Sequence, residues 1–283
     1  GEVHLIENMA YSDVGPFKKD YSADFNTWDI PQVGTAYLAL NVKSGPFALD
    51  HPDGKMLRQA VAHAIDREAI HQAIFNGLGH KINGFYSEAS PWHMPGIENT
   101  KEYDPEKSKF ILRKLNAANT PIEVVARQSY EYMHQSGELV HAMLTEVGFK
   151  AANNVYDNPV LRQKYKKNDF GIDSTANSYR FEPDGWYSRN ILSTAPETQL
   201  RTGYKNEKAD KLIIEARATT DKAKRTELYT AVESLVNEDC AQIYTHAVPL
   251  TSAGIKKLKG YQPAFAGPFN IAGAGIRTAY FEE

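Results

Sequence analysis

Residues 35–70 read TAYLALNVKSGPFALDHPDGKMLRQAVAHAIDREAI, and this stretch decides the fold. The apolar run at 35–42 is short and ends at turn residues 44–46, which predicts a buried strand. Residues 56–66 then place apolar side chains on one face at helical spacing, and Asp66 is of the residue type that caps a second helix. A strand followed by two helices indicates an α/β fold.

A second unit of alternating elements lies further along the chain. Residues 104–106 (Asp-Pro-Glu) predict a helix start, because Asp caps, Pro fits the first helical position and Glu favours the positive end of the helix dipole. A strand at 122–126, a helix at 135–147 closed by Gly148, and a strand at 150–156 form a βαβ unit, which implies parallel pairing. Other predicted elements are helices at 159–167, 207–218 and 222–237, a helical turn within 183–193, and strands at 170–176 and 241–250.

Composition narrows the class of protein. The chain has 283 residues, 42% of them hydrophobic and 24% charged, which is the profile of a globular protein. Its formal net charge of -3, without a basic run, does not favour binding to nucleic acid. Its longest apolar stretches are shorter than the roughly 18 residues that a membrane span needs. Cys240 is the only cysteine, so an intrachain disulfide is excluded.

Five segments, in order, resemble one family: the peptide/nickel class of solute-binding proteins of ABC importers, which includes the oligopeptide and dipeptide binders. Each segment alone is a weak signal, but together they cover most of the chain. They are YLALN (37–41) running into LRQAVAHAIDREAI (57–70), FNGLG (75–79), YDPEK (103–107), YKNEKADKLI (204–213), and the stretch from LY (228–229) through ED (238–239) to IY (243–244).

The resemblance implies an architecture, because members of this class have two lobes around a ligand cleft. It implies an α/β, periplasmic-binding-protein-like lobe with a mixed sheet and flanking helices, plus remnants of a first lobe. Residues 1–34 are then expected to be the end of the first lobe and the outgoing crossover, 35–252 the second ligand-binding lobe, and 253–283 the return to the first lobe. The crossovers would be the hinge, and this chain would carry half of the cleft.

The resemblance also implies a function. The protein would be the solute-binding component of an ABC importer, capturing a peptide or peptide-like ligand between its lobes and delivering it to a membrane permease. It would be a monomer without catalytic activity and without a cofactor. Its expected location is the periplasm, or the outer side of the membrane by means of a lipid anchor.

Arg127 is the first candidate ligand contact. Dipeptide binders of this family hold the ligand carboxylate with an arginine in the loop after the first strand of the βαβ unit, and Arg127 falls at that place. A guanidinium group pairs with a carboxylate through two hydrogen bonds. The alternative is a solvated loop arginine.

The other candidates lie after the predicted third strand. The family holds the ligand amino group with an aspartate there, but this chain has Tyr179 at that position, followed by Arg180. A neutral tyrosine next to a cation favours an anionic, amino-blocked or ring-stacked ligand. Arg180 would otherwise form a surface ion pair with Glu182 or Asp184. Trp186 is a further candidate for stacking on the ligand, although packing in the core is the commoner role of a tryptophan.

Other functions remain as alternatives. The same scaffold could bind a metal chelate, an opine or an oligosaccharide, or serve a sensory partner instead of a permease. An α/β hydrolase would need an activated nucleophile, and Cys240 with His246 is the pair to consider, but no catalytic motif surrounds them. The nine histidines show no i, i+4 pair of the kind that binds zinc on a helix, so scattered packing and surface histidines are expected.

Overall fold

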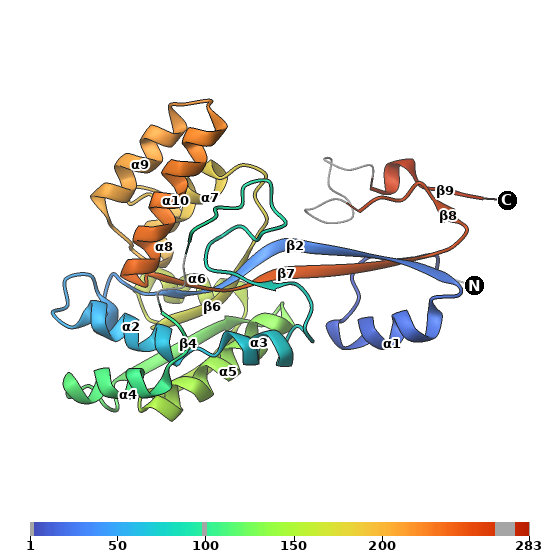
Figure 1. Ribbon diagram of the computed structural model, residues 1–283. Coiled ribbons are helices and arrows are strands. Elements are labelled where there is room, and N and C mark those ends of the chain that lie inside the picture. Colours follow the sequence, from blue (N-terminus) through green and yellow to red (C-terminus); the bar gives the residue numbers. More distant parts are fainter. Residues whose placement is uncertain (1–2, 98–100, 264–274, 283) are drawn as a thin grey trace.

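A seven-stranded mixed sheet lies at the centre of the computed structural model, which describes residues 3–97, 101–263 and 275–282 (Figure 1). The strand order is β1-β7-β2-β6-β4-β5, with β3 also paired to β7, and β8 pairs with β9 separately. In the described ranges the strands are β1 (Leu5–Ile6), β2 (Phe25–Leu40), β3 (His80–Lys81), β4 (Pro121–Arg127), β5 (Lys150–Tyr156), β6 (Ile172–Ser178), β7 (Gln242–Ile255), β8 (Leu258–Lys259) and β9 (Tyr280–Phe281).

Helices cover both faces of this sheet. Those described are α1 (Tyr11–Tyr21), α2 (Gly54–Ala64), α3 (Arg67–Ala73), α4 (Pro105–Lys114), α5 (Glu131–Val147), α6 (Asn158–Lys167), α7 (Asp184–Asn190), α8 (Pro196–Arg201), α9 (Glu207–Arg217) and α10 (Lys222–Asp239), with 3-10 turns at Gly45–Phe47 and Ile276–Thr278. Figure 1 shows α7, α9 and α10 on one side of the sheet and α2, α4 and α5 on the other. Of the helices that the structure describes, none is both long and apolar enough to cross a membrane. The α/β fold class with a mixed sheet and flanking helices is confirmed.

The strands β2 and β7 form a long antiparallel ribbon that leaves the helical layers. It runs toward α1, β8 and β9, where both chain ends lie (Figure 1). The sequence predicts that this strand starts at residue 35, but in the structure β2 begins at Phe25. Pairing shifts register between Ile30 and Gly34, around Pro31, because proline has no N–H to donate to a ladder. This interruption hid the longer strand from the sequence pattern.

Local capping signals correctly predicted several helix boundaries. The Asp66 carboxylate accepts a hydrogen bond from the Ala69 N–H at 2.9 Å, and Asp104 accepts one from the Lys107 N–H at 2.9 Å. Gly148 ends α5 with φ +110°, a conformation that favours glycine. In contrast, α5 begins at Glu131, before the predicted start at residue 135. The preceding residue, Tyr130, makes no side-chain capping hydrogen bond, so no capping signal marked this start in the sequence.

The βαβ prediction is also confirmed, since β4 pairs in parallel with both β5 and β6. The central strands are covered on both faces, so over much of their length they have no solvent-exposed side. In β2 every residue from Gly34 to Leu40 is buried, and in β6 the first five residues are buried. Burying each large aliphatic side chain contributes about 1.5–3 kcal/mol, so this double-sided core positions the ends of the strands firmly.

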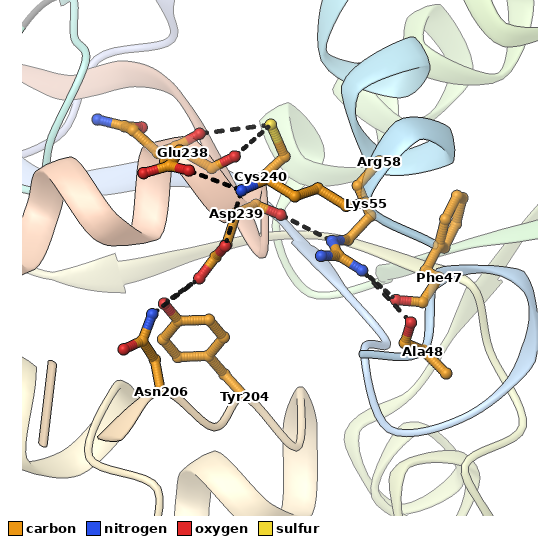
Figure 2. Close-up of polar contacts among 10 residues, drawn as sticks. Phe47, Ala48, Lys55, Arg58, Tyr204, Asn206, Glu238, Asp239 and Cys240 are labelled. Carbon is orange, nitrogen blue, oxygen red and sulfur yellow. Dashed lines mark hydrogen bonds and ion pairs between the residues drawn. The ribbon is translucent and has the colours of Figure 1, made fainter. Parts of the chain in front are cut away.

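A polar cluster joins the two helical layers at the C-terminal end of α10 (Figure 2). The Arg58 side chain, on α2, is buried, and its Nε donates to the Asp239 carbonyl oxygen at 2.7 Å while a terminal nitrogen donates to the Phe47 carbonyl oxygen at 2.7 Å. The Asp239 carboxylate accepts hydrogen bonds from the Tyr204 hydroxyl at 2.8 Å and the Asn206 amide at 3.0 Å. A cation at a helix C-terminus satisfies unpaired carbonyl groups, so the cluster is structural.

Candidate functional site

The carboxyl ends of the parallel strands β4 and β6 meet at one edge of the sheet. Arg127 is the last residue of β4, and Asn177 and Ser178 end β6. Strand β2 passes close by, because Gly34 pairs with Ser178 and a Cβ at Gly34 would lie 2.7 Å from the Asn177 carbonyl oxygen. Glycine is therefore required there by close backbone approach. This edge is where open α/β sheets bind ligands.

A cavity of about 310 Å3 opens at this edge. Ligand sites in proteins commonly measure about 300–1,000 Å3, so its size suits part of a larger cleft. Four strands, two helices and the residues just before each of those helices contribute to it: Asn8, Tyr11, Val33, Gly34, Arg127, Tyr130, Tyr132, Met133, Ala176, Asn177, Ser178, Val248, Pro249 and Leu250.

The cavity is lined by a positively charged side chain and by no negatively charged one among the described residues. Among the described residues that line it, Arg127 is the only one with an ionised side chain, since burial raises the pKa of Tyr11 and of Tyr132 above the ordinary value. Arg127 has no hydrogen-bond or ion-pair partner within residues 3–97, 101–263 and 275–282, and its Nε atom is buried. An unpaired guanidinium in a concave site attracts an anion.

A buried hydrogen-bond network lies behind Asn177. The Asn177 side-chain amide donates to the Tyr37 hydroxyl oxygen at 2.8 Å, and Arg201 donates to the same oxygen at 3.3 Å. Arg201 also forms a buried ion pair with Asp173 at 2.5 Å and donates to Thr175 Oγ1 at 3.0 Å. Because Arg201 and Asp173 neutralise each other, the network adds no net charge to the cavity.

The structure does not bring Tyr179 or Trp186 to this cavity. Tyr179 is 5% exposed and shares a hydrogen bond of 2.8 Å with Ser90. Trp186 is 0% exposed, stacks on Phe85 with ring centroids 4.1 Å apart, and donates its indole N–H to the Tyr244 hydroxyl at 3.3 Å. A side chain without exposed surface has the packing role in this conformation, which is the commoner role of a tryptophan.

Arg180 also lies outside the Arg127 cavity. The two carboxylates considered as its partners bind other cations: Glu182 pairs with Arg225, and Asp184 lies 3.4 Å from Arg217. Within the described part of the chain, Arg180 forms no ion pair, and its Nε is buried without a partner. The surface-pair alternative is therefore not observed, and contact between Arg180 and a ligand stays a prediction.

Several cavity residues were not among the sequence-predicted site residues. Asn177 stands in the segment where the sequence predicts ligand contacts, and a polar residue at the end of a buried strand is a usable signal. No sequence signal pointed to Tyr11 or Asn8, because only the tertiary structure brings them into the same cavity as Arg127. Tyr132 comes from the unpredicted first turn of α5.

A larger cavity of about 460 Å3 lies beneath the loop at residues 82–97 and includes His71, Tyr86 and His93. None of the predicted ligand contacts lines it, and neither does any residue of the parallel strands β4, β5 and β6. No group of three or more metal-binding side chains occurs among the described residues. The Arg127 cavity is therefore the better candidate site.

Cys240 and His246, the pair considered as nucleophile and base, have pKa values that do not suit these roles. Burial raises the pKa of the Cys240 thiol to about 11, so the reactive thiolate is scarce near neutral pH. Burial lowers the pKa of His246 to about 3, and its Nε2 is bonded to the Leu78 carbonyl oxygen at 2.7 Å. Neither group is prepared for proton transfer at neutral pH.

Comparisons with known proteins identify relatives of this chain. The di/tripeptide-binding protein 1 of Pseudomonas aeruginosa is 26% identical over 290 residues, covering 99% of this chain and 50% of that protein. The chain spans about half the length of the curated relatives it matches.

Two solved structures share the fold. The periplasmic binding protein DppA of Helicobacter pylori, in complex with peptide STSA, has a TM-score of 0.83 at 18% identity, covering 100% of this chain and 53% of that chain. AgaA of A. tumefaciens R10, in complex with agropinic acid, has a TM-score of 0.79 at 22% identity, covering 100% and 57%. The sequence model of bacterial extracellular solute-binding proteins, family 5 Middle, matches residues 1–199. The family resemblance is thus confirmed, and this chain belongs to the family 5 bacterial extracellular solute-binding proteins.

Proposed function

We propose that the protein captures a peptide or peptide-like ligand through an anionic group and delivers it, chemically unchanged, to the membrane permease of an ABC importer. The observation that carries the proposal is the unpaired Arg127 guanidinium in the cavity at the carboxyl edge of β4 and β6. A peptide carboxylate fits that guanidinium, because two parallel N–H···O bonds hold it in one orientation. The peptides bound by relatives support this ligand class.

The β2–β7 ribbon is the proposed hinge. It is the long connection between the helical layers and the part with both chain ends, and its pairing is interrupted between Ile30 and Gly34 (Figure 1). A ribbon with an irregular ladder bends there more easily than within a regular sheet. Since Val33 and Gly34 also line the Arg127 cavity, closure about this point would act directly on a bound ligand. The boundaries near 34 and 252 are proposed as the crossovers between lobes.

The proposal includes a location and a partner. A protein of this family would work outside the cytoplasm, in the periplasm or on a lipid anchor, as a monomer that a permease recognises in its closed form. No chemical conversion is proposed, because the cavity combines a cation with hydroxyl and amide groups and lacks an activated nucleophile among its described residues.

A non-peptide organic anion is the second candidate ligand. The single positive charge of the cavity and Tyr179, at the place where the family has its aspartate, both favour a ligand without a free amino group. The agropinic acid complex of AgaA supports such a ligand on this fold. Opines, metal chelates and oligosaccharides remain the classes to test, and an oligosaccharide would need an anionic group.

Native mass spectrometry of the full-length protein, as purified, tests the proposal. A bound mass that is lost on denaturation and is recovered unchanged after incubation is the expected result. Isothermal titration then compares trialanine with its C-terminal amide, and wild type with Arg127→Met. A charged hydrogen-bonded contact contributes about 1.5–3 kcal/mol, so the variant should bind trialanine about 10- to 100-fold more weakly.

The matched control is Arg162→Met, on the exposed face of α6, which should leave binding unchanged. For Arg127→Met, the trialanine amide should bind about as it does to wild type. Equal loss for the acid and the amide would mean that Arg127 does not bind the carboxylate, and appearance of a turnover product would exclude a pure binding role.

A further inference from the structure

We propose that Asn177 is a specificity-determining residue whose side-chain oxygen accepts a hydrogen bond from an uncharged donor of the ligand, next to the anionic group held by Arg127. The proposal rests on the proposed function, and it adds a second, neutral contact point in the same cavity. For a peptide whose carboxylate binds Arg127, the neighbouring donor is the last amide N–H. The two residues together would recognise the end of a peptide chain.

The orientation of the Asn177 side chain carries the proposal. Its Nδ2 donates to the Tyr37 hydroxyl oxygen at 2.8 Å, on the side of the protein core. The oxygen and the nitrogen of an amide group lie in one plane and diverge from the carbon between them, so an inward Nδ2 leaves Oδ1 for a partner elsewhere. Within the described residues Oδ1 has no hydrogen-bond partner and keeps exposed surface, and Asn177 lines the cavity.

Arg201 binds the same hydroxyl oxygen as Asn177. Its guanidinium is a permanent donor, and it donates to the Tyr37 oxygen at 3.3 Å from a buried position where Asp173 balances its charge. Tyr37 is itself buried and carries its oxygen between the Arg201 and Asn177 donors. In this arrangement the Tyr37 hydroxyl oxygen accepts hydrogen bonds from both Arg201 and Asn177 Nδ2, and Oδ1 of Asn177 lies outside the network.

The charge of the cavity decides which donor the ligand supplies. An ammonium group next to a guanidinium needs a carboxylate between them, and the described cavity residues include none. A neutral N–H or O–H fits beside Arg127 without repulsion. Arg127 ends β4 and Asn177 ends β6, and β4 and β6 are adjacent parallel strands, so both side chains project from the same edge.

A matched pair of ligands isolates this contact in the full-length protein. The probes are trialanine and its depsipeptide, in which an ester oxygen replaces the last amide N–H. Both keep the carboxylate for Arg127, but the ester has no hydrogen to donate and turns a lone pair toward Oδ1. Wild type should bind the ester about tenfold more weakly in isothermal titration, because an acceptor that the bound ligand covers is left without a partner.

The Asn177→Ala variant should bind trialanine and the ester equally. Asn26→Ala, on the exposed outer part of β2, is the matched control and should keep the tenfold difference. Asn177→Asp serves if the alanine variant unfolds, because it keeps an acceptor oxygen. It should retain the ester penalty while binding both anions more weakly.

The outcomes separate the two proposals. Equal affinity of wild type for both probes, or the same ester penalty in Asn177→Ala, would overturn the role of Asn177 and leave the solute-binding proposal standing. Failure of wild type to bind either probe, combined with an empty protein in native mass spectrometry, would overturn the proposed function and this inference with it.

Discussion

Substitution of Glu233 by glutamine should make the protein more stable above neutral pH. Glu233 is fully buried on α10, and its Oε1 accepts hydrogen bonds from the Tyr187 hydroxyl at 2.7 Å, the Tyr244 hydroxyl at 3.0 Å and the Phe85 N–H at 3.3 Å. Its Oε2 is buried without a partner among the described residues. Loss of hydration outweighs these hydrogen bonds and raises the pKa of Glu233 from 4.5 to about 7.

The magnitude follows from that pKa. Below pH 4.5 the carboxyl is protonated in the folded and the unfolded chain, so its ionisation does not affect stability. Between pH 4.5 and about 7 only the unfolded chain ionises readily, which lowers the free energy of unfolding by about 3 kcal/mol in total. Above pH 7 the loss is complete. Glutamine has no proton to lose and resembles the protonated carboxyl in shape and hydrogen bonding.

Urea unfolding of the wild-type protein and Glu233→Gln, at pH 5 and pH 8, measures this effect. At pH 5 the two proteins should agree within about 1 kcal/mol, and at pH 8 the variant should be more stable by up to about 3 kcal/mol. Glu227→Gln removes an exposed carboxylate from the same helix, paired only with Lys224 at the surface, and should change stability by less than about 0.5 kcal/mol. A Glu233→Gln variant that is no more stable than wild type at pH 8 would refute the argument.

Three further substitutions test the packing that supports the site. Arg201→Leu should lower the free energy of unfolding, measured in urea, by about 3–5 kcal/mol, because the Asp173 side chain is 1% exposed and loses its counter-charge. A loss under about 1 kcal/mol would show that water reaches Asp173. Trp186→Ala should cost about 3–5 kcal/mol by calorimetry, and a much smaller loss would place this ring outside the core. Gly148→Ala should cost about 1 kcal/mol in urea, since φ is +110° there, and unchanged stability would show that the turn relaxes.

The sequence predicted best where short-range chemistry decides the structure. Asp66 and Asp104 cap helices because the bonded N–H groups lie three residues away, within reach of any chain that forms the helix. The βαβ unit was recognisable because its apolar periodicity changes twice within a short stretch. The family resemblance placed Arg127 in the loop directly after the strand at 122–126, and in the structure it is the last residue of that strand, β4.

Burial was harder to predict from the sequence. Tyr179, in the loop after β6, and Trp186, in the first turn of α7, belong to a segment rich in charged and polar residues, which is typical of an exposed segment, yet both are buried. Their partners, Ser90 and Phe85, lie about 90–100 residues earlier in the chain. A pattern within one window of sequence has no information about which distant loop will cover it.

The sequence by itself determined the family, the α/β fold class and most helix boundaries, because these depend on side-chain periodicity, capping and the order of motifs along the chain. Only the tertiary structure decided that Arg127 has no carboxylate partner in the described chain, that Tyr11 and Val248 share a cavity with it, and that Asn177 turns its amide nitrogen inward. Those features arise where β2, β4, β6 and β7 meet. Residues separated by more than a hundred positions become neighbours there, and their free energies depend on burial and hydrogen bonding that no single segment contains.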